Sequence, residues 1–260
     1  MAGKVLLTGA TGGIGTAIAR AFAERGASLV LSGRRADALE PLAAEVGGRA
    51  VVCDLADRGD LDRLLAEAGE VDVLVANAAN PASGLLTDLR QDQIDRMLEV
   101  NLRAPIALAH ALAPAMVARQ SGQLVFISSL SGKVASPASS LYSATKFGLR
   151  GFALGIREDL RPHGVGVSLV LPGFIRDAGM FADANVSLPR GVGTRTPEQV
   201  ALAVIRAVER NRAEVEVAPL GLRLGAAFAS VAPELAASVS RKMGSDKVAS
   251  DLATGQRHKR

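Results

Sequence analysis

Short apolar segments alternate with longer stretches of helical periodicity along most of the chain. The short segments are rich in Val, Leu and Ile, and most are apolar throughout rather than at every second position. Strands of that kind are buried on both faces, as in a parallel sheet covered by helices. We predict strands at 5–8, 28–32, 50–53, 71–76, 123–128, 165–171 and 214–218.

Longer segments with helical periodicity lie between these strands, near 14–25, 36–46, 57–68, 91–118, 141–161 and 197–211. Strands that alternate with helices form parallel sheets, because each helix carries the chain back to the start of the next strand. The pattern therefore predicts a single α/β domain over residues 1–218. We expect it to be doubly wound, with a parallel seven-stranded sheet and helices on both faces.

The alternation stops after Pro219, so that residues 219–260 form a C-terminal extension of a different kind. Apolar residues recur there at three- and four-residue spacings, with a break at Pro233: Leu224, Phe228, Val231, Leu235, Val239 and Met243. The spacing predicts a helical hairpin or a broken helix with an apolar face. Such an extension covers a substrate mouth, seals an oligomer face or makes weak contact with a membrane surface. The pattern leaves these three roles open.

The positive charge of the chain is concentrated at its C-terminal end. The 260 residues carry a formal net charge of +4, and residues 241–260 hold six Lys or Arg against two Asp. The other 240 residues are balanced, with 24 basic and 24 acidic side chains. A nucleic-acid-binding domain would carry its positive charge on the folded body. We therefore expect no nucleic-acid partner.

Residue counts exclude several other classes of protein. One cysteine, Cys53, and three histidines leave no disulfide framework and no Cys/His zinc site, so we predict no metal. The N-terminal residues lack the pattern of a signal peptide, and no run of 18 apolar residues is present. We therefore expect a cytoplasmic protein without a transmembrane segment.

A glycine-rich segment follows the first predicted strand and opens the first predicted helix: Thr8-Gly9-Ala10-Thr11-Gly12-Gly13-Ile14-Gly15. Residues without a Cβ let the backbone approach a pyrophosphate, and the helix N-terminus supplies free N–H groups. The segment therefore predicts a dinucleotide-binding site. Its glycines fit both GxxxGxG and GxxGxxG, and the motif alone does not choose between them.

The end of the second predicted strand bears on which dinucleotide binds. An acidic residue at this point bonds the ribose 2′-hydroxyl and selects NAD. Gly33 stands where that acid would be, and Arg34 and Arg35 follow it. Two guanidinium groups suit a 2′-phosphate by charge and by forked hydrogen bonding, which favours NADP(H) over NAD(H). The alternative is a solvated charge pair at the start of a helix.

Ser129, Tyr142 and Lys146 form a candidate acid–base group. Tyr142 and Lys146 are four residues apart, so they share one face of the predicted helix. A nearby ammonium favours the phenolate and lowers the pKa of a tyrosine from its usual value of about 10. Tyr142 is the only tyrosine in the chain, and Ser129 follows a predicted strand at the sheet edge where α/β proteins bind ligands.

Further short motifs stand at the ends of predicted strands or within a helix: Asp54-Leu55, Ala76-Asn77-Ala78-Ala79, Asn101 and Pro172-Gly173. In this order and at these separations, the motifs resemble the short-chain dehydrogenases/reductases, in their compact single-domain branch with a Rossmann fold. The likeness runs from about Lys4 to Ala218, and it favours the TGxxxGxG reading of the glycine-rich segment. The resemblance implies catalytic roles for Asn101, Ser129, Tyr142 and Lys146. It implies cofactor contacts from Thr8, Gly9, Thr11, Gly13, Ile14, Gly15, Arg34, Arg35, Asp54, Leu55, Asn77, Tyr142, Lys146, Pro172, Gly173 and Ile175.

The resemblance implies an NADP(H)-dependent oxidoreductase that interconverts a carbonyl and a secondary alcohol. Tyr142 then gives a proton to the developing alkoxide, and Ser129 holds the same oxygen. Lys146 lowers the pKa of Tyr142 and bonds the nicotinamide ribose, while Asn101 positions a water that links Lys146 to solvent.

The chain departs from the family pattern in two places. Ala76 and Ala79 replace the first Asn and the Gly of the family's Asn-Asn-Ala-Gly motif. Asp177 stands where the family often has a Thr that touches the nicotinamide carboxamide. Small residues at 76 and 79 preserve the packing there, whereas Asp177 affects the anchoring of the carboxamide and not the acid–base group.

The sequence gives weaker signals for the substrate and for the oligomeric state than for the reaction. The 174–195 loop and the extension lean apolar, which favours a lipophilic carbonyl compound. The alternatives are a 3-oxoacyl-thioester reductase and a non-catalytic NAD(P)-sensing protein, which would usually lack the Tyr or the Lys. We also expect a homodimer or homotetramer through the helices near 91–118 and 141–161. That expectation rests on an apolar surface assigned to Ile106, Leu108, Leu112, Met116, Phe147, Phe152 and Leu154.

Overall fold

A single parallel sheet organises the chain. The computed structural model describes residues 3–80, 84–177, 192–242, 251 and 254–255. Its sheet has seven strands in the order β3-β2-β1-β4-β5-β6-β7, and every neighbouring pair is parallel. The strands are β1 (Lys4–Thr8), β2 (Ser28–Gly33), β3 (Arg49–Val52), β4 (Val73–Ala76), β5 (Gly122–Ile127), β6 (Val165–Pro172) and β7 (Glu214–Val217). The strand order reverses between β1 and β4, so the predicted doubly wound α/β fold is confirmed.

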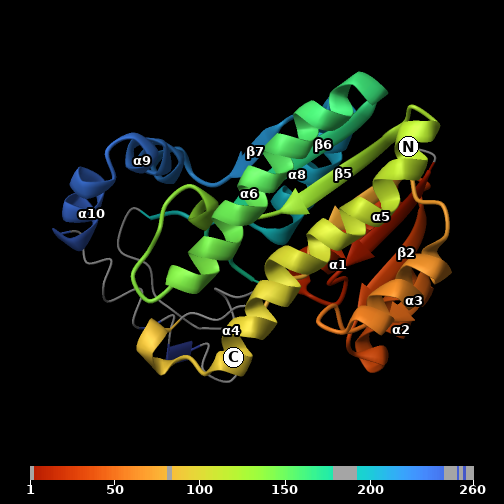
Figure 1. Ribbon diagram of the computed structural model, residues 1–260, viewed down its shortest axis with the longest axis horizontal. Helices are drawn as coiled ribbons and strands as arrows, with labels where there is room; N and C mark the ends of the chain where they lie inside the picture. Colours follow the sequence, from red (N-terminus) through yellow and green to blue (C-terminus); the bar gives the residue numbers. More distant parts are fainter. Residues whose placement is uncertain (1–2, 81–83, 178–191, 243–250, 252–253, 256–260) are drawn as a thin grey trace.

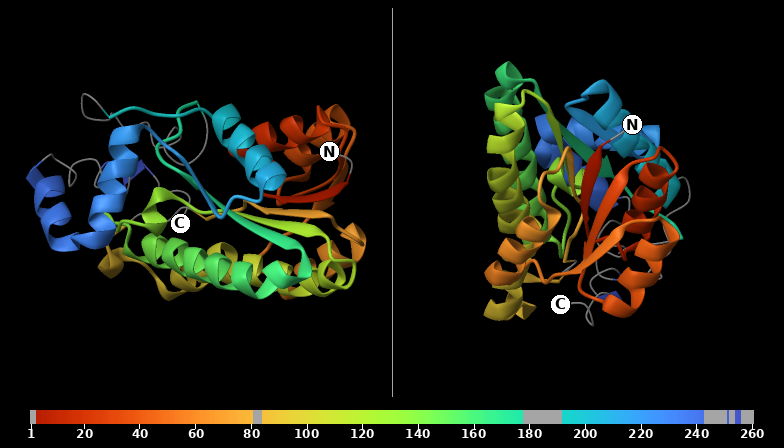
Figure 2. Two further views of the ribbon diagram at one scale, coloured as in Figure 1. Left: turned by 90° about the horizontal axis from the view of Figure 1, so that it is seen from above. Right: turned by 90° about the vertical axis from the view of Figure 1, so that its right-hand side faces the viewer.

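Helices cover both faces of the sheet (Figures 1 and 2). One apolar cluster joins the sheet to α1 (Gly13–Ala23), α2 (Ala36–Glu45) and α8 (Pro197–Arg210). The other joins it to α3 (Arg58–Ala68), α5 (Ala104–Ala118) and α6 (Ser140–Leu160). Short 3₁₀ turns η1 (Leu86–Asp88), η3 (Leu130–Gly132) and η4 (Arg161–His163) complete the connections. The central strands β1, β4, β5 and β6 are largely apolar because both of their faces are covered, whereas the edge strand β7 alternates Glu with Val.

The helix expected near 91–118 contains a π-helical turn. It consists of α4 (Gln91–Leu98), η2 (Glu99–Arg103) and α5 without interruption. The stretch Gln91–Ala118 is long enough to span a membrane, and an 18-residue window within it has a mean hydropathy of 1.3. Its apolar side chains Leu108 and Met116 are fully buried against the sheet, and Met97 is also fully buried. We therefore take it as a core helix of the α/β domain.

One basis of the oligomer prediction is wrong. Leu108, Leu112 and Met116, assigned to the outer surface, lie in the core cluster that also contains Leu74 and Phe126. They are only 0%, 8% and 0% exposed, because the sheet covers them. Smaller side chains such as Ala111 and Ala115 face outward on α5 instead.

The C-terminal extension begins with two helices, α9 (Leu220–Val231) and α10 (Pro233–Lys242), as expected from the break at Pro233. The loop 174–195 is described only at its two ends, where an isolated bridge pairs Ile175 with Arg195. The apolar residues Met180 and Phe181 of that loop lie outside the described residues, as do Met243 and the tail 257–260.

Candidate active site

The glycine-rich turn after β1 is closely packed against itself and against the end of β4. Gly9 has a φ of +65°, a left-handed conformation that favours glycine. A Cβ on Gly9 would lie 2.7 Å from the Cα of Ala78, and a Cβ on Gly15 would lie 2.2 Å from the Gly9 carbonyl oxygen. Gly12 then begins α1 without a side-chain cap. The turn therefore has the backbone-walled shape that fits a pyrophosphate at a helix N-terminus.

Thr8 and Asn77 hold this turn in place. The buried Thr8 hydroxyl accepts hydrogen bonds from the backbone N–H groups of Asn77 (3.1 Å) and Ala78 (3.2 Å). The Asn77 amide donates to the carbonyl oxygens of Thr8 (3.1 Å) and Gly9 (3.0 Å). These bonds join the carboxyl ends of β1 and β4, the neighbouring strands between which the strand order reverses. Ligands of α/β sheets bind at such a reversal.

Arg34 and Arg35 lie exposed at the end of β2, beside the same turn. Gly33, directly before them, is buried, and a Cβ at this position would lie 3.4 Å from the Thr11 side chain. That contact is close but leaves room for a small side chain. The two guanidinium groups are therefore accessible to a phosphate at the ribose end of the expected dinucleotide.

Asp54, after β3, has a partner that sequence reasoning missed. Arg96 of α4 donates two hydrogen bonds to its carboxylate, at 3.1 and 2.8 Å. Burial raises the pKa of Asp54, but the Arg96 guanidinium and the Ala56 N–H outweigh it and hold that pKa below its usual value. Leu55 beside it is buried. Arg96 stands in an ordinary polar helix, so the sequence held no signal for this contact.

Ser129, Tyr142 and Lys146 converge at the carboxyl end of β5. Ser129 begins the 3₁₀ turn η3, and its hydroxyl makes a hydrogen bond with the Tyr142 side chain. The Lys146 ammonium lies 5.6 Å from the centre of the Tyr142 ring and donates to the Ile127 carbonyl at 3.0 Å. Lys146 is only 2% exposed. Helix α6 thus brings Tyr142 and Lys146 to the strand end that carries Ser129.

Burial controls the protonation of this group. It lowers the pKa of Lys146 to about 8 and raises the pKa of Tyr142 to about 12. The hydrogen bond with Ser129 acts in the opposite direction on Tyr142 but is the smaller effect. The expected lowering of the Tyr142 pKa by Lys146 is therefore wrong for the protein alone, because desolvation of the phenolate dominates. At neutral pH Tyr142 carries its proton.

Asn101 is buried in the π-helical turn η2. Its side chain accepts a hydrogen bond from the Asn80 N–H at 2.6 Å and donates to the Asn80 carbonyl at 3.0 Å. The same amide lies 3.4 Å from the Thr145 hydroxyl, which donates to the Tyr142 carbonyl at 2.8 Å. Asn80 and Thr145 were not singled out from the sequence. Their only signal is adjacency to the Asn77 and Lys146 motifs.

The segment after β6 packs against the end of β7. The Gly173 N–H donates to the Val217 carbonyl at 3.1 Å, and a Cβ on Gly173 would lie 3.0 Å from that of Ala218. Pro172 and Ile175 are buried. Asp177 is exposed with a φ of +69° and pairs with Arg176 at 3.3 Å.

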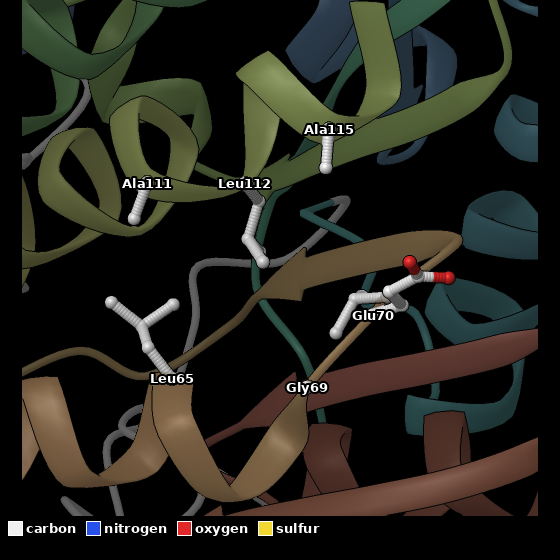
Figure 3. A pocket seen from close by; sticks show the side chains of 7 residues that line it. Leu65, Gly69, Glu70, Ala111, Leu112 and Ala115 are labelled. Atoms are coloured by element: carbon white, nitrogen blue, oxygen red, sulfur yellow. The ribbon is translucent and has the colours of Figure 1, made fainter. Parts of the chain in front are cut away.

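Figure 3 shows a separate depression lined by side chains of α3 and α5. It holds about 180 Å³ and lies between α3 and α5, with Leu65, Gly69, Ala111, Leu112 and Ala115 among its lining residues. Val71, also in its lining, precedes the amino end of β4, whereas Ser129 follows the carboxyl end of β5. This depression is therefore not part of the candidate active site.

Within the described residues, no group of three His, Cys, Asp or Glu side chains gathers as a metal site would require. Cys53 is buried, and burial raises the pKa of its thiol to about 11. A thiol with that pKa is not a nucleophile at neutral pH.

The doubly wound sheet, the glycine-rich turn and the Ser/Tyr/Lys group together define a class of NAD(P)-dependent oxidoreductases. A family model described as short chain dehydrogenase matches residues 3–187. The chain belongs to the short-chain dehydrogenase/reductase family.

Known proteins similar to this chain share the family. Ketoacyl reductase HetN of a Nostoc species is 37% identical over 222 residues, which cover 82% of this chain and 77% of that protein. Dehydrogenase/reductase SDR family member 7B of Bos taurus is 33% identical over 256 residues, covering 89% of this chain and 78% of that protein. A solved short-chain dehydrogenase from Sphingobium yanoikuyae in complex with NADPH has a TM-score of 0.78 at 29% identity, covering 89% of this chain and 94% of that chain.

Proposed function

We propose that the protein is an NADP(H)-dependent reductase of a lipophilic carbonyl compound, with Tyr142 as the proton donor. The observation that carries the proposal is the convergence of Ser129, Tyr142 and Lys146 at the carboxyl end of β5, on the sheet edge that also carries the glycine-rich turn after β1. These groups lie at the sheet edge where a dinucleotide and a carbonyl substrate would meet.

The residues around the glycine-rich turn fit a dinucleotide. Gly9, Gly13 and Gly15, with Thr11 and Ile14, would hold the pyrophosphate against the start of α1. Arg34 and Arg35 would bind the 2′-phosphate, and Asp54 and Leu55 would lie at the adenine. Thr8 and Asn77 would hold the turn, while Pro172, Gly173 and Ile175 would line the nicotinamide end. Bound NADPH supplies the hydride.

The protein's own groups handle the proton. Tyr142, protonated at neutral pH, donates to the oxygen of the substrate as negative charge develops there. The Ser129 hydroxyl donates to the same oxygen and stabilises that charge. The Lys146 ammonium lies close enough to stabilise the phenolate that Tyr142 becomes. Asn101 fixes the Asn80 backbone and, through Thr145, the turn of α6 that carries Tyr142.

A preference for NADP(H) is supported by Arg34 and Arg35 after β2. It is also supported by position 33, where a glycine stands in place of the acidic residue that would select NAD(H). The NADPH complex of the similar Sphingobium yanoikuyae protein agrees with it. Titration of the protein with NADPH and NADH, followed by cofactor fluorescence, tests this. Tighter binding of NADH would contradict the proposal.

A 3-oxoacyl thioester is the second candidate substrate, because the similar Nostoc protein is named a ketoacyl reductase. The two candidates are separated by NADPH consumption with a panel of aliphatic ketones, steroids, quinones and a 3-oxoacyl thioester. A thioester turned over with a kcat/KM at least about tenfold above every other compound would select the second candidate. No turnover of any compound would contradict reductase function.

We also propose a homodimer or homotetramer formed through α5 and α6. The outward side of α6 carries Phe147, which is 42% exposed, next to Gly148 and Gly151. Glycines on a helix surface allow a second helix to approach closely. Light scattering should give a multiple of the 26.8 kDa chain mass, and Phe147→Arg should lower the measured mass.

The buried, reduced Cys53 is compatible with the cytoplasmic location expected from the sequence.

A further inference from the structure

Helix α9 has two apolar sides, and only one of them is covered. Ala226 and Ala229 are buried, and Leu222 packs against the core cluster beneath them. The opposite side carries Leu220, Leu224, Phe228 and Val231, which are 64%, 62%, 49% and 86% exposed. At 100° per residue these four positions fall within an arc of about 80°. A surface helix of a globular protein normally presents polar residues on that side.

The uncovered apolar side continues onto α10. Leu235 and Val239, four residues apart, are also exposed. We call these six residues the outer stripe: Leu220, Leu224, Phe228, Val231, Leu235 and Val239. Figures 1 and 2 show α9 and α10 at one end of the molecule, with α10 outside the body formed by the sheet and its helices. No described helix or strand of the chain covers the outer stripe.

The stripe is firmly connected to the rest of the protein. Arg223 of α9 pairs with Glu216 of β7 at 2.8 Å. The Ser230 hydroxyl donates to the Lys133 carbonyl at 3.2 Å, on the turn that follows Ser129. Helix α9 is therefore held at a definite position beside the candidate active site. Its exposed apolar side is a fixed surface of the folded protein.

Basic residues outnumber acidic ones next to the outer stripe along the sequence: Arg223 precedes Leu224, and Arg241 and Lys242 follow Val239, against the one acid Glu234. Arg223 lies at its edge, and a groove between α8, β7 and α9 is lined by Arg195, Arg206 and Arg223 against one acid, Glu216. In the sequence, the C-terminal residues 241–260 hold six Lys or Arg against two Asp, whereas the other 240 residues are balanced. An apolar strip flanked by cations is complementary to an anionic lipid surface.

We propose that α9 and α10 dock the protein onto an anionic membrane surface. The outer stripe enters the boundary between headgroups and acyl chains, and the flanking Lys and Arg side chains contact anionic headgroups. The protein lies on the membrane through this face and does not cross it. The candidate active site then opens near the lipid, where apolar compounds concentrate.

A second copy of the chain fits this surface less well. Two copies docked stripe to stripe would bring both positively charged ends together, and like charges at short range oppose association. An anionic surface attracts the same charges. The charge therefore selects the membrane as the occupant, and the second copy becomes an outcome of the test.

The test uses the full chain and vesicles, without cofactor or substrate, so it does not depend on the proposed reaction. Vesicles of phosphatidylcholine with about one third phosphatidylserine are compared with phosphatidylcholine alone by co-sedimentation. We expect binding to the anionic vesicles at least about tenfold tighter. Raising the salt to about 1 M should weaken it strongly, because charges at a surface are then screened. Equal or absent binding to both vesicles would overturn the proposal.

Variants locate the contact. Leu224→Glu with Phe228→Glu should reduce binding to anionic vesicles about tenfold or more. The control is Leu98→Glu on α4, a residue that is 38% exposed but lies outside both the outer stripe and the arginine-lined groove. Thermal unfolding confirms that each variant folds. Unchanged vesicle binding by the double variant would refute the docking face. A double variant that instead converts a dimer to a monomer in light scattering would assign the stripe to a second copy and also overturn the proposal.

Discussion

Lys133 Nζ lies 2.9 Å from the Oε1 atom of Glu216. This ion pair joins the turn after Ser129 to the edge strand β7. The same ammonium lies 2.7 Å from Glu214. Glu216 also pairs with Arg223 of α9, and Glu214 pairs with Arg150 of α6. One ion-pair network therefore connects the catalytic turn, the edge of the sheet, α6 and the C-terminal helices.

Lys133→Met should destabilise the protein by about 1–3 kcal/mol, because it leaves two largely buried carboxylates with one cation each. Burial raises the pKa values of Glu214 and Glu216, but their ion pairs outweigh it and hold both below 4.5. That stabilisation is present above pH 4.5 and disappears as the pH falls further. Urea unfolding at pH 7 and pH 4 measures it, and the difference between wild type and variant should shrink at pH 4. The control is Glu45→Gln, which breaks the exposed ion pair between Arg20 and Glu45. It should change the free energy of unfolding less than Lys133→Met does.

Tyr142→Phe should reduce kcat by about 10²–10⁴-fold, because the phenyl ring keeps the packing but carries no proton to donate. The affinity for NADPH should change little. Steady-state kinetics on the best substrate and cofactor titration measure the two effects. A variant that retains more than about a tenth of the wild-type kcat would show that Tyr142 is not the proton donor.

Gly33→Asp combined with Arg34→Leu should shift cofactor preference from NADPH towards NADH. A carboxylate accepts a hydrogen bond from a free 2′-hydroxyl and repels a 2′-phosphate. The 3.4 Å separation between a Cβ at 33 and Thr11 indicates that the new side chain can be accommodated with little movement. The ratio of kcat/KM values for the two cofactors reports the shift. Arg35→Leu alone is the comparison and should have the smaller effect, since we assign Arg34 the larger contribution.

The free energy of unfolding should rise between pH 7 and pH 9.5 because of Lys146. Its pKa is lowered to about 8 by burial, from 10.5, so the unfolded chain binds more protons in this range. Raising the pH therefore favours the folded state, by about 1–2 kcal/mol over the interval. Chemical unfolding of wild type and Lys146→Met at several pH values checks the sign. The same slope in both proteins would show that Lys146 does not cause the rise.

The sheet could be predicted because strands buried on both faces are apolar along their whole length. The order of those strands along the chain then implied a doubly wound topology, since each connecting segment had the length and periodicity of a helix. The glycine turn and the Ser129, Tyr142 and Lys146 group were recognisable for a related reason. Their chemistry depends on residue types at short, regular separations, which are visible in one dimension.

Which apolar side chains are covered was decided only by the tertiary structure. Periodicity showed that Leu108 and Leu224 belong to apolar helix faces, but not that the sheet covers the first and leaves the second exposed. The direction of the Tyr142 pKa shift was likewise decided only by the tertiary structure. Spacing placed a cation nearby, whereas the dominant effect is desolvation by residues from several elements. Contacts between distant segments, such as Asn80 with Asn101 and Asp54 with Arg96, depend on how the layers pack, and no local pattern encodes that packing.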